Sequence, residues 1–170
     1  MEVLVSDTSV IIDLDRGDLL DQLFGLPYEL CVPDLLYKKE LAGELGDRLQ
    51  ALGLNVVELT PEELTRATTL RRQIKVLSTP DTFAFAFAFA LAQARRWTLL
   101  TGDRALRDLC VEQGVKMHGV LWVISELNRV GVTDAGVLHA ALTAIHAHPR
   151  CRLPTVEVRR ILVALGGNRS

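Results

Sequence analysis

Four acidic residues of this chain end or follow apolar runs, and carboxylates in such positions can bind a metal ion. They are Asp7, Glu40, Asp81 and Asp103. Two carboxylates held about 4 Å apart repel each other by about 4 kcal/mol at an effective dielectric of 20. A divalent cation offsets this repulsion, and hard oxygen ligands select Mg²⁺ or Mn²⁺. Such a metal activates water and stabilises charge on phosphate oxygens, so these residues indicate phosphodiester chemistry.

The four acids can act together only if the fold brings them to one place, and the order of elements predicts that it does. Short apolar strands are expected at 3–6, 29–32, 54–59, 97–101 and 114–118. They alternate with helical segments, which predicts a mostly parallel five-stranded sheet in a three-layer α/β/α fold. Sites in such sheets form at the carboxyl ends of the strands. Asp7 and Asp103 converge there if the first and fourth strands are neighbours.

The segment 81–94 alternates phenylalanine with alanine, a period of two that at face value favours a strand. We interpret it as a helix, because alanine is the best helix former and the run is too long for a typical strand. Ser78 or Thr79 can cap this helix, Pro80 suits its first position, and Asp81 lies in its first turn. Phenylalanines two apart point to opposite sides of a helix, so this helix is predicted to be buried nearly all round.

Helix boundaries elsewhere follow from capping residues and glycines. Asp18 is expected to cap a short helix, and Thr60 followed by Pro61 is a strong helix start. Gly43 and Gly46 are expected to break the helix that follows the second strand. The last third of the chain is predicted to be helical, at 121–130, 134–147 and 155–165. We therefore divide the chain into a core at 1–118 and a helical extension at 119–170 that packs on the same domain.

The composition is that of an ordinary soluble globular protein, with 170 residues, 49% hydrophobic and 24% charged. No apolar run reaches the ~18 residues of a membrane span, and the first residues lack the pattern of a signal peptide. Cys31, Cys110 and Cys151 match no zinc or disulfide spacing, which favours the cytoplasm. The net charge of −2 argues against a protein that coats nucleic acid by bulk charge, but not against an enzyme that contacts it locally.

Four segments in this order resemble the PIN domain, the metal-dependent ribonuclease fold of bacterial and archaeal VapC-type toxins and their relatives. The segments are 6–14, 32–41, 80–82 with the alanine-rich helix, and 99–104, and together they fall within the core. The chain departs from many of these toxins in two ways. It lacks the aromatic residue that they place shortly after the last acid, and its helical extension is longer than that of a compact toxin.

The resemblance implies that the four acids bind Mg²⁺ or Mn²⁺ and activate water. Thr101 matches the small hydroxyl residue that the family places beside the last acid, and Thr8 is implied to orient the phosphate. Arg104 lies next to the predicted pocket, within reach of a phosphate. The resemblance further implies an endoribonuclease of single-stranded RNA that leaves 5′-phosphate and 3′-hydroxyl ends. It also implies a toxin role with a small antitoxin partner, and a homodimer.

Other interpretations remain open. Asp7, Asp81 and Asp103 could each be a helix-capping residue, and Glu40 an ordinary exposed glutamate. The fold could also be a catalytically silent PIN module whose helical extension binds a protein or RNA partner. A receiver-like signalling domain shares the alternating pattern, but it needs an acidic pair after the first strand, where Asp7 stands alone.

Overall fold

A parallel five-stranded sheet forms the centre of the computed structural model, which describes residues 2–74, 82–102 and 107–166, the side chains of 82 and 83 excepted. The strand order is β3-β2-β1-β4-β5, and all four neighbouring pairs are parallel. The strands are β1 (Glu2–Ser6), β2 (Tyr28–Pro33), β3 (Asn55–Val57), β4 (Thr98–Leu100) and β5 (Met117–His118). The predicted sheet is confirmed, although β3, β4 and β5 are shorter than expected.

The first and fourth strands are neighbours, as predicted. Leu4 pairs with Thr98, and Ser6 pairs with Leu100, so the two strands end at the same level of the sheet. The backbone N–H of Asp7 donates to the carbonyl oxygen of Leu100 at 2.9 Å, which carries the ladder one residue further. The residues that follow β1 and β4 therefore lie side by side at the carboxyl edge of the sheet.

Helices α1 to α7 lie between successive strands, as expected for parallel pairing, and α8 to α10 follow the last strand. They are α1 (Thr8–Arg16), α2 (Leu20–Leu23), α3 (Asp34–Leu36), the π-helical turn η1 (Tyr37–Leu41), α4 (Glu44–Leu52), α5 (Pro61–Ile74), α6 (Thr82–Arg95), α7 (Arg107–Glu112), α8 (Val120–Val130), α9 (Ala135–Ala147) and α10 (Thr155–Gly166).

Two of the predicted helix boundaries are wrong. Asp18 does not cap α2, because its backbone is in the left-handed region at φ 56 and the helix begins after Leu19 with no side-chain cap. The segment after β2 breaks at Gly43, whose φ of 125 is unsuited to a helix, but not at Gly46. Gly46 lies buried inside α4, where an added Cβ would stand 2.7 Å from the hydroxyl oxygen of Tyr37. Its small size allows this close contact between α4 and η1.

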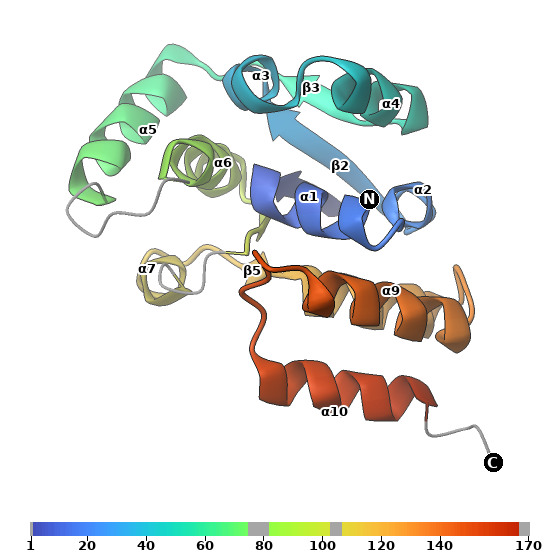
Figure 1. Cartoon of the computed structure of the whole chain (residues 1–170). Coiled ribbons are helices and arrows are strands. Elements are labelled where there is room, and N and C mark those ends of the chain that lie inside the picture. The colour runs from blue at the N-terminus through green and yellow to red at the C-terminus, as the bar shows by residue number, and fades with distance from the viewer. Residues whose placement is uncertain (1, 75–81, 103–106, 167–170) are drawn as a thin grey trace.

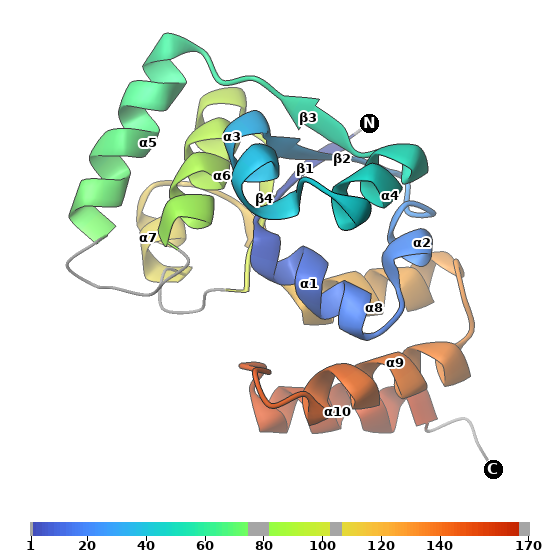
Figure 2. The ribbon, with the colours of Figure 1, turned by 45° about the horizontal axis from the view of Figure 1, so that its top comes forward.

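Successive residues of the strands point to opposite faces of the sheet and enter two separate apolar clusters. Leu4 and Leu100 belong to a cluster with α1, α2, α8, α9 and α10, whereas Val5 and Leu99 belong to a cluster with α5, α6 and α7. Figures 1 and 2 show α5, α6 and α7 gathered on one side of the molecule, with α9 and α10 stacked beyond α1. This is the predicted three-layer α/β/α arrangement, since helices cover both faces of the sheet.

The alternating phenylalanine and alanine segment forms the helix α6, as predicted. Phe85, Phe87 and Phe89 are exposed by only 0%, 6% and 2%, and the residues from Ala84 to Ala92 are all buried. The helix is buried nearly all round because α5, α3 and strands β1, β2 and β4 pack around it. The residues predicted to cap it, 78–81, lie outside the described residues.

The helices of the extension pack against the same apolar cluster as α1. Helix α9 contacts α1, and α10 contacts α9. A Cβ added at Gly17, directly after α1, would stand 2.7 Å from Cδ1 of Ile145 in α9. The fold thus brings the carboxyl end of α9 close to the carboxyl end of α1, while the division into a core and an extension stays a prediction. Across the described ranges, no helix has the length and apolar character needed to cross a membrane.

Candidate functional site

Asp7 lies at the junction between β1 and α1, and the fold holds its carboxylate in place. The residue is 3% exposed and is the N-cap of α1. Its Oδ1 accepts a hydrogen bond from the backbone N–H of Val10 at 3.3 Å and another from Ser9 Oγ at 2.7 Å. The capping interpretation is thus correct for Asp7, but capping alone leaves Oδ2 unexplained.

Oδ2 of Asp7 accepts a hydrogen bond from Thr101 Oγ1 at 2.5 Å, and both residues are buried. Thr101 directly follows β4, so this contact joins the ends of the two central strands. Beside it, the backbone N–H of Gly102 donates to Ser9 Oγ at 3.1 Å. A Cβ at Gly102 would stand 2.9 Å from Ser9 Oγ, so glycine permits this close approach. The acid is therefore oriented from two sides by hydroxyl groups.

Glu40 reaches the same place from the turn η1, on the other side of α1's first residues. Thr8 Oγ1 donates a hydrogen bond to Glu40 Oε2. Glu40 is exposed, whereas Asp7 is buried. Turns of the π-helical kind, such as η1, occur often at functional sites because they redirect a side chain. Thr8 follows Asp7 directly, so this hydrogen bond ties Glu40 to the residue beside Asp7.

A cavity of about 480 Å³ lies over these residues. Its described lining consists of Asp7, Thr8, Ser9, Ile12, Asp13, Arg16, Glu40, Gly102, Arg150 and Arg152. Another cavity, of about 370 Å³, lies between α5, α6 and α7 and is lined mainly by glutamine, threonine, arginine and leucine side chains. We place the candidate site in the first cavity, because it combines paired acids, hydroxyl groups and arginines at the carboxyl edge of the sheet.

The structure describes only part of the predicted site. Asp7, Thr8 and Glu40 line one cavity, and Thr101 contacts Asp7. Asp81, Asp103 and Arg104 lie outside the described residues. Among the residues that the structure does describe, no group of three His, Cys, Asp or Glu side chains is placed to hold a metal ion. The donor set that is described nevertheless fits a hard cation, because it consists of carboxylate and hydroxyl oxygens.

Sequence reasoning missed several residues of this cavity. Ser9, Asp13 and Arg16 lie four and three residues apart on α1, a spacing that places them on one helix face and that the sequence could have shown. Asp13 pairs with Arg16 at 3.3 Å. Burial raises the pKa of Asp13, against the opposing effect of Arg16. Arg150 and Arg152 come from the turn between α9 and α10, and no local pattern marks them.

The sequence and the fold of the chain were compared with those of known proteins. No curated protein matches the chain in sequence. A similar solved structure is VapBC2 from Rickettsia felis, in complex with a DNA fragment from its promoter. The TM-score is 0.46 and the identity 12%, over 69% of this chain and 98% of that chain, so the likeness carries no functional argument. The profile of the family DUF3368, described as a PIN domain, matches residues 3–167. Because that match spans nearly the whole sequence, the chain belongs to the PIN-domain family.

Proposed function

We propose that this PIN domain is a metal-dependent endoribonuclease that hydrolyses phosphodiester bonds of single-stranded RNA. The observation that carries the proposal is the fixed carboxylate of Asp7, which lies in one cavity with Glu40. The two residues are brought together across the sheet edge, and the hydroxyl groups of Thr101 and Ser9 hold Asp7 in one orientation. A residue that served only as a helix cap would need neither the second acid nor the bond to Oδ2.

Asp7 and Glu40, completed by Asp81 and Asp103, are the residues that would hold Mg²⁺ or Mn²⁺. When bound, such an ion supplies an activated water and stabilises charge on the phosphate oxygens. The residues of the chain do the positioning. Thr101 holds Asp7 in one orientation through the hydrogen bond to Oδ2, and Thr8 orients Glu40 and the phosphate. We assign Arg104 a phosphate contact, since it follows Asp103 in the sequence.

The experiment is cleavage of single-stranded RNA in the presence of Mn²⁺, with end-group analysis of the products. We expect the unmodified chain to leave 5′-phosphate and 3′-hydroxyl ends. Asp7→Asn should lose cleavage, because the amide removes a negative ligand, while the fold survives because asparagine is also a good N-cap. Asp81→Asn and Asp103→Asn should lose cleavage in the same way. Full activity in all three variants would refute the proposal.

A matched control is available in α9. Asp134 is the N-cap of that helix and accepts from the backbone N–H of Val137 at 2.9 Å, so it caps its helix as Asp7 caps α1. Asp134 does not line the cavity. Asp134→Asn should therefore keep full cleavage. If it lost activity to the same degree as Asp7→Asn, the effect would come from the helix cap and not from metal binding.

The rival function is a catalytically silent module that binds a protein or RNA partner. Calorimetric titration with Mn²⁺ separates the two, because a silent module has no need of the ion. We expect binding that Asp7→Asn and Glu40→Gln weaken and Asp134→Asn leaves unchanged. No detectable binding at millimolar Mn²⁺ would favour the silent module.

The proposal extends to a toxin role with a small antitoxin and to a homodimer, both on the ground of the family resemblance. Expression of the chain alone should then arrest growth, and expression of the Asp7→Asn variant should not. Sedimentation of the purified chain measures its oligomeric state. If cells that express the soluble, RNA-cleaving chain grew normally, the toxin role would be refuted and the nuclease proposal would stand.

A further inference from the structure

Arginines from two distant parts of the chain line the same cavity as the acids. Arg16 belongs to α1, and Arg150 and Arg152 belong to the turn between α9 and α10. Among the described lining residues, three are carboxylates and three are arginines, so their formal charges cancel. A cavity lined by acids alone is suited to bind a metal ion. A cavity that also contains arginines can bind an anion next to the metal ion.

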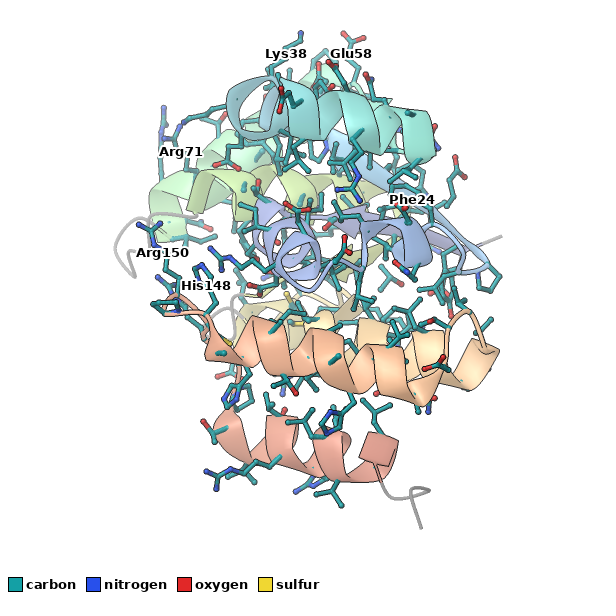
Figure 3. All side chains as sticks on the ribbon, turned by 45° about the vertical axis from the view of Figure 1, so that its right-hand side comes forward. Phe24, Lys38, Glu58, Arg71, His148 and Arg150 are labelled. Atoms are coloured by element: carbon teal, nitrogen blue, oxygen red, sulfur yellow. The ribbon has the colours of Figure 1, made fainter. Side chains whose placement is uncertain are left out.

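The helical extension holds these two arginines in place. Helix α9 packs on α1 through buried residues such as Leu142 and Ile145, and the turn after it has its own hydrogen bonds. The backbone N–H of Arg150 donates to His148 Nδ1 at 3.1 Å, and that of Cys151 donates to the His148 carbonyl oxygen at 2.9 Å. Figure 3 shows His148 and Arg150 at the end of α9, on the side that faces α1. The turn is thus fixed at the edge of the cavity.

The three arginines differ in whether their guanidinium group already forms an ion pair. Arg16 pairs with Asp13 at 3.3 Å, and its side chain is 24% exposed. Arg150 and Arg152 are exposed, and within the described part of the chain neither guanidinium group takes part in an ion pair. Their side-chain donors therefore remain available to a ligand. The planar guanidinium group is suited to bind a phosphate through two parallel hydrogen bonds.

We propose that Arg150 and Arg152 bind phosphate groups of the RNA strand next to the cleaved one, so that the helical extension forms one wall of the substrate site. This inference rests on the proposed ribonuclease function. A phosphodiester strand fits the mixed lining, because one phosphate can lie at the acids with their cation while its neighbour meets the arginines. A divalent cation at the acids would also make the charge of the cavity positive, which favours a polyanion.

The test measures binding of a single-stranded RNA oligonucleotide by fluorescence anisotropy across a range of salt concentrations. The background variant is Asp7→Asn, which keeps the strand from being cleaved. Arg150→Gln with Arg152→Gln should raise the Kd about tenfold or more. The slope of log K against log salt should fall in magnitude by about 1.4, because each phosphate contact contributes about 0.7 for a single strand. An unchanged Kd and an unchanged slope would overturn the inference.

The matched control is Arg159→Gln with Arg160→Gln, which removes the same charge from exposed positions of α10 that do not line the cavity. We expect this variant to bind RNA as the background chain does. An equal loss of affinity in both double variants would show only the effect of bulk charge and would overturn the assignment to the cavity. Urea unfolding of each variant checks that the exposed substitutions leave the fold intact.

Two further measurements separate this inference from the proposed function and from a protein ligand. A chain that binds RNA through Arg150 and Arg152 but never cleaves it would refute the nuclease proposal and support the phosphate contact. A chain that cleaves RNA but binds it equally well without Arg150 and Arg152 would support the nuclease proposal and refute the phosphate contact. A glutamate-rich peptide tests the protein alternative. If its binding depended on the two arginines while RNA binding did not, the surface would be assigned to an acidic protein partner and the inference overturned.

Discussion

Thr101 Oγ1 donates a 2.5 Å hydrogen bond to Asp7 Oδ2, although the two residues are 94 positions apart in the sequence. The bond joins the ends of β1 and β4, which lie side by side in the sheet. It links the fold directly to the site, because the orientation of the acid depends on correct pairing of the two central strands. In metal sites, the loss of a group that orients a ligand by a hydrogen bond typically lowers metal affinity or activity about 10- to 100-fold.

Thr101→Val should impair the site more than the fold. The change keeps the shape of the side chain but removes one donor from a buried carboxylate, at a cost of about 1–3 kcal/mol in the free energy of unfolding. We expect a loss of about 10- to 100-fold in Mn²⁺ affinity or cleavage, and recovery in Thr101→Ser. Thr98→Val is the control, since Thr98 begins β4, whereas Thr101 follows its end, and Thr98 donates to Glu2 at the opposite end of the strand. Equal losses of cleavage in the two valine variants would contradict this role.

Gly102→Ala should disturb the orientation of Asp7 through Ser9. The added Cβ would stand 2.9 Å from Ser9 Oγ, which is tighter than normal contact, so Ser9 must move away from its hydrogen bonds. We expect about tenfold weaker Mn²⁺ binding with a small loss of stability. Gly119→Ala is a suitable comparison, because a Cβ there meets nothing nearer than the carbonyl oxygen of Thr101 at 3.4 Å. Calorimetry with Mn²⁺ on both variants decides, and identical affinities would refute the prediction.

Glu126 should make the protein lose stability in acid. The hydrogen bond from Arg129 lowers the pKa of Glu126 to about 2, against burial and with help from Tyr28. Because the folded pKa lies below the ordinary value of 4.5, the stabilisation is fully present above pH 4.5 and is lost as the pH falls towards 2. Glu126→Gln should therefore flatten the fall in the free energy of unfolding over that range.

Urea unfolding at a series of pH values measures this effect. Glu112→Gln, at an exposed position of α7, serves as the control and should follow the unmodified chain at every pH. The prediction fails if Glu126→Gln shows the same acid dependence as the control.

Phe85→Ala should destabilise the fold strongly. Phe85 is 0% exposed and packs against Phe89, with ring centroids 5.6 Å apart. Truncation of a fully buried phenylalanine costs about 3–5 kcal/mol. Val163→Ala, whose side chain is 72% exposed on α10, should change the free energy of unfolding by less than about 0.5 kcal/mol. Similar midpoints of denaturation for the two variants would mean that α6 is not packed as described.

Much of the fold could be predicted because the sequence signals are local. The apolar strands, the start of α5 at Thr60 and the helical character of α6 all follow from residue types within a few positions. The predicted capping of α5 is visible as paired hydrogen bonds between Thr60 and Glu63. The prediction that Asp18 caps a helix was wrong, because an aspartate can also adopt the left-handed backbone conformation, as Asp18 does.

The site was harder to predict, because its members depend on contacts between distant segments. Asp7 could be named from its position after the first strand, where sites in parallel sheets form, and Thr101 from the family resemblance. Arg150 and Arg152 could not, since their place depends on how α9 packs on α1 and on the turn at His148. No spacing in the sequence encodes that packing. Glu40 could be named as an acid that follows the second strand, but an exposed glutamate on a helix is common, so its role as a metal ligand came from the family resemblance.

The central position of β1 has a consequence for the newly made protein. Of the five strands, β1 is made first. It pairs with β2 on one side and with β4 on the other, and β4 is made later. Until then Asp7 has no Thr101 beside it, and the wall that carries Arg150 and Arg152 is still unmade. A nascent chain therefore lacks the hydrogen bond that orients Asp7 until β4 has been made, and the lining of the cavity is complete only after the turn beyond α9 has been made.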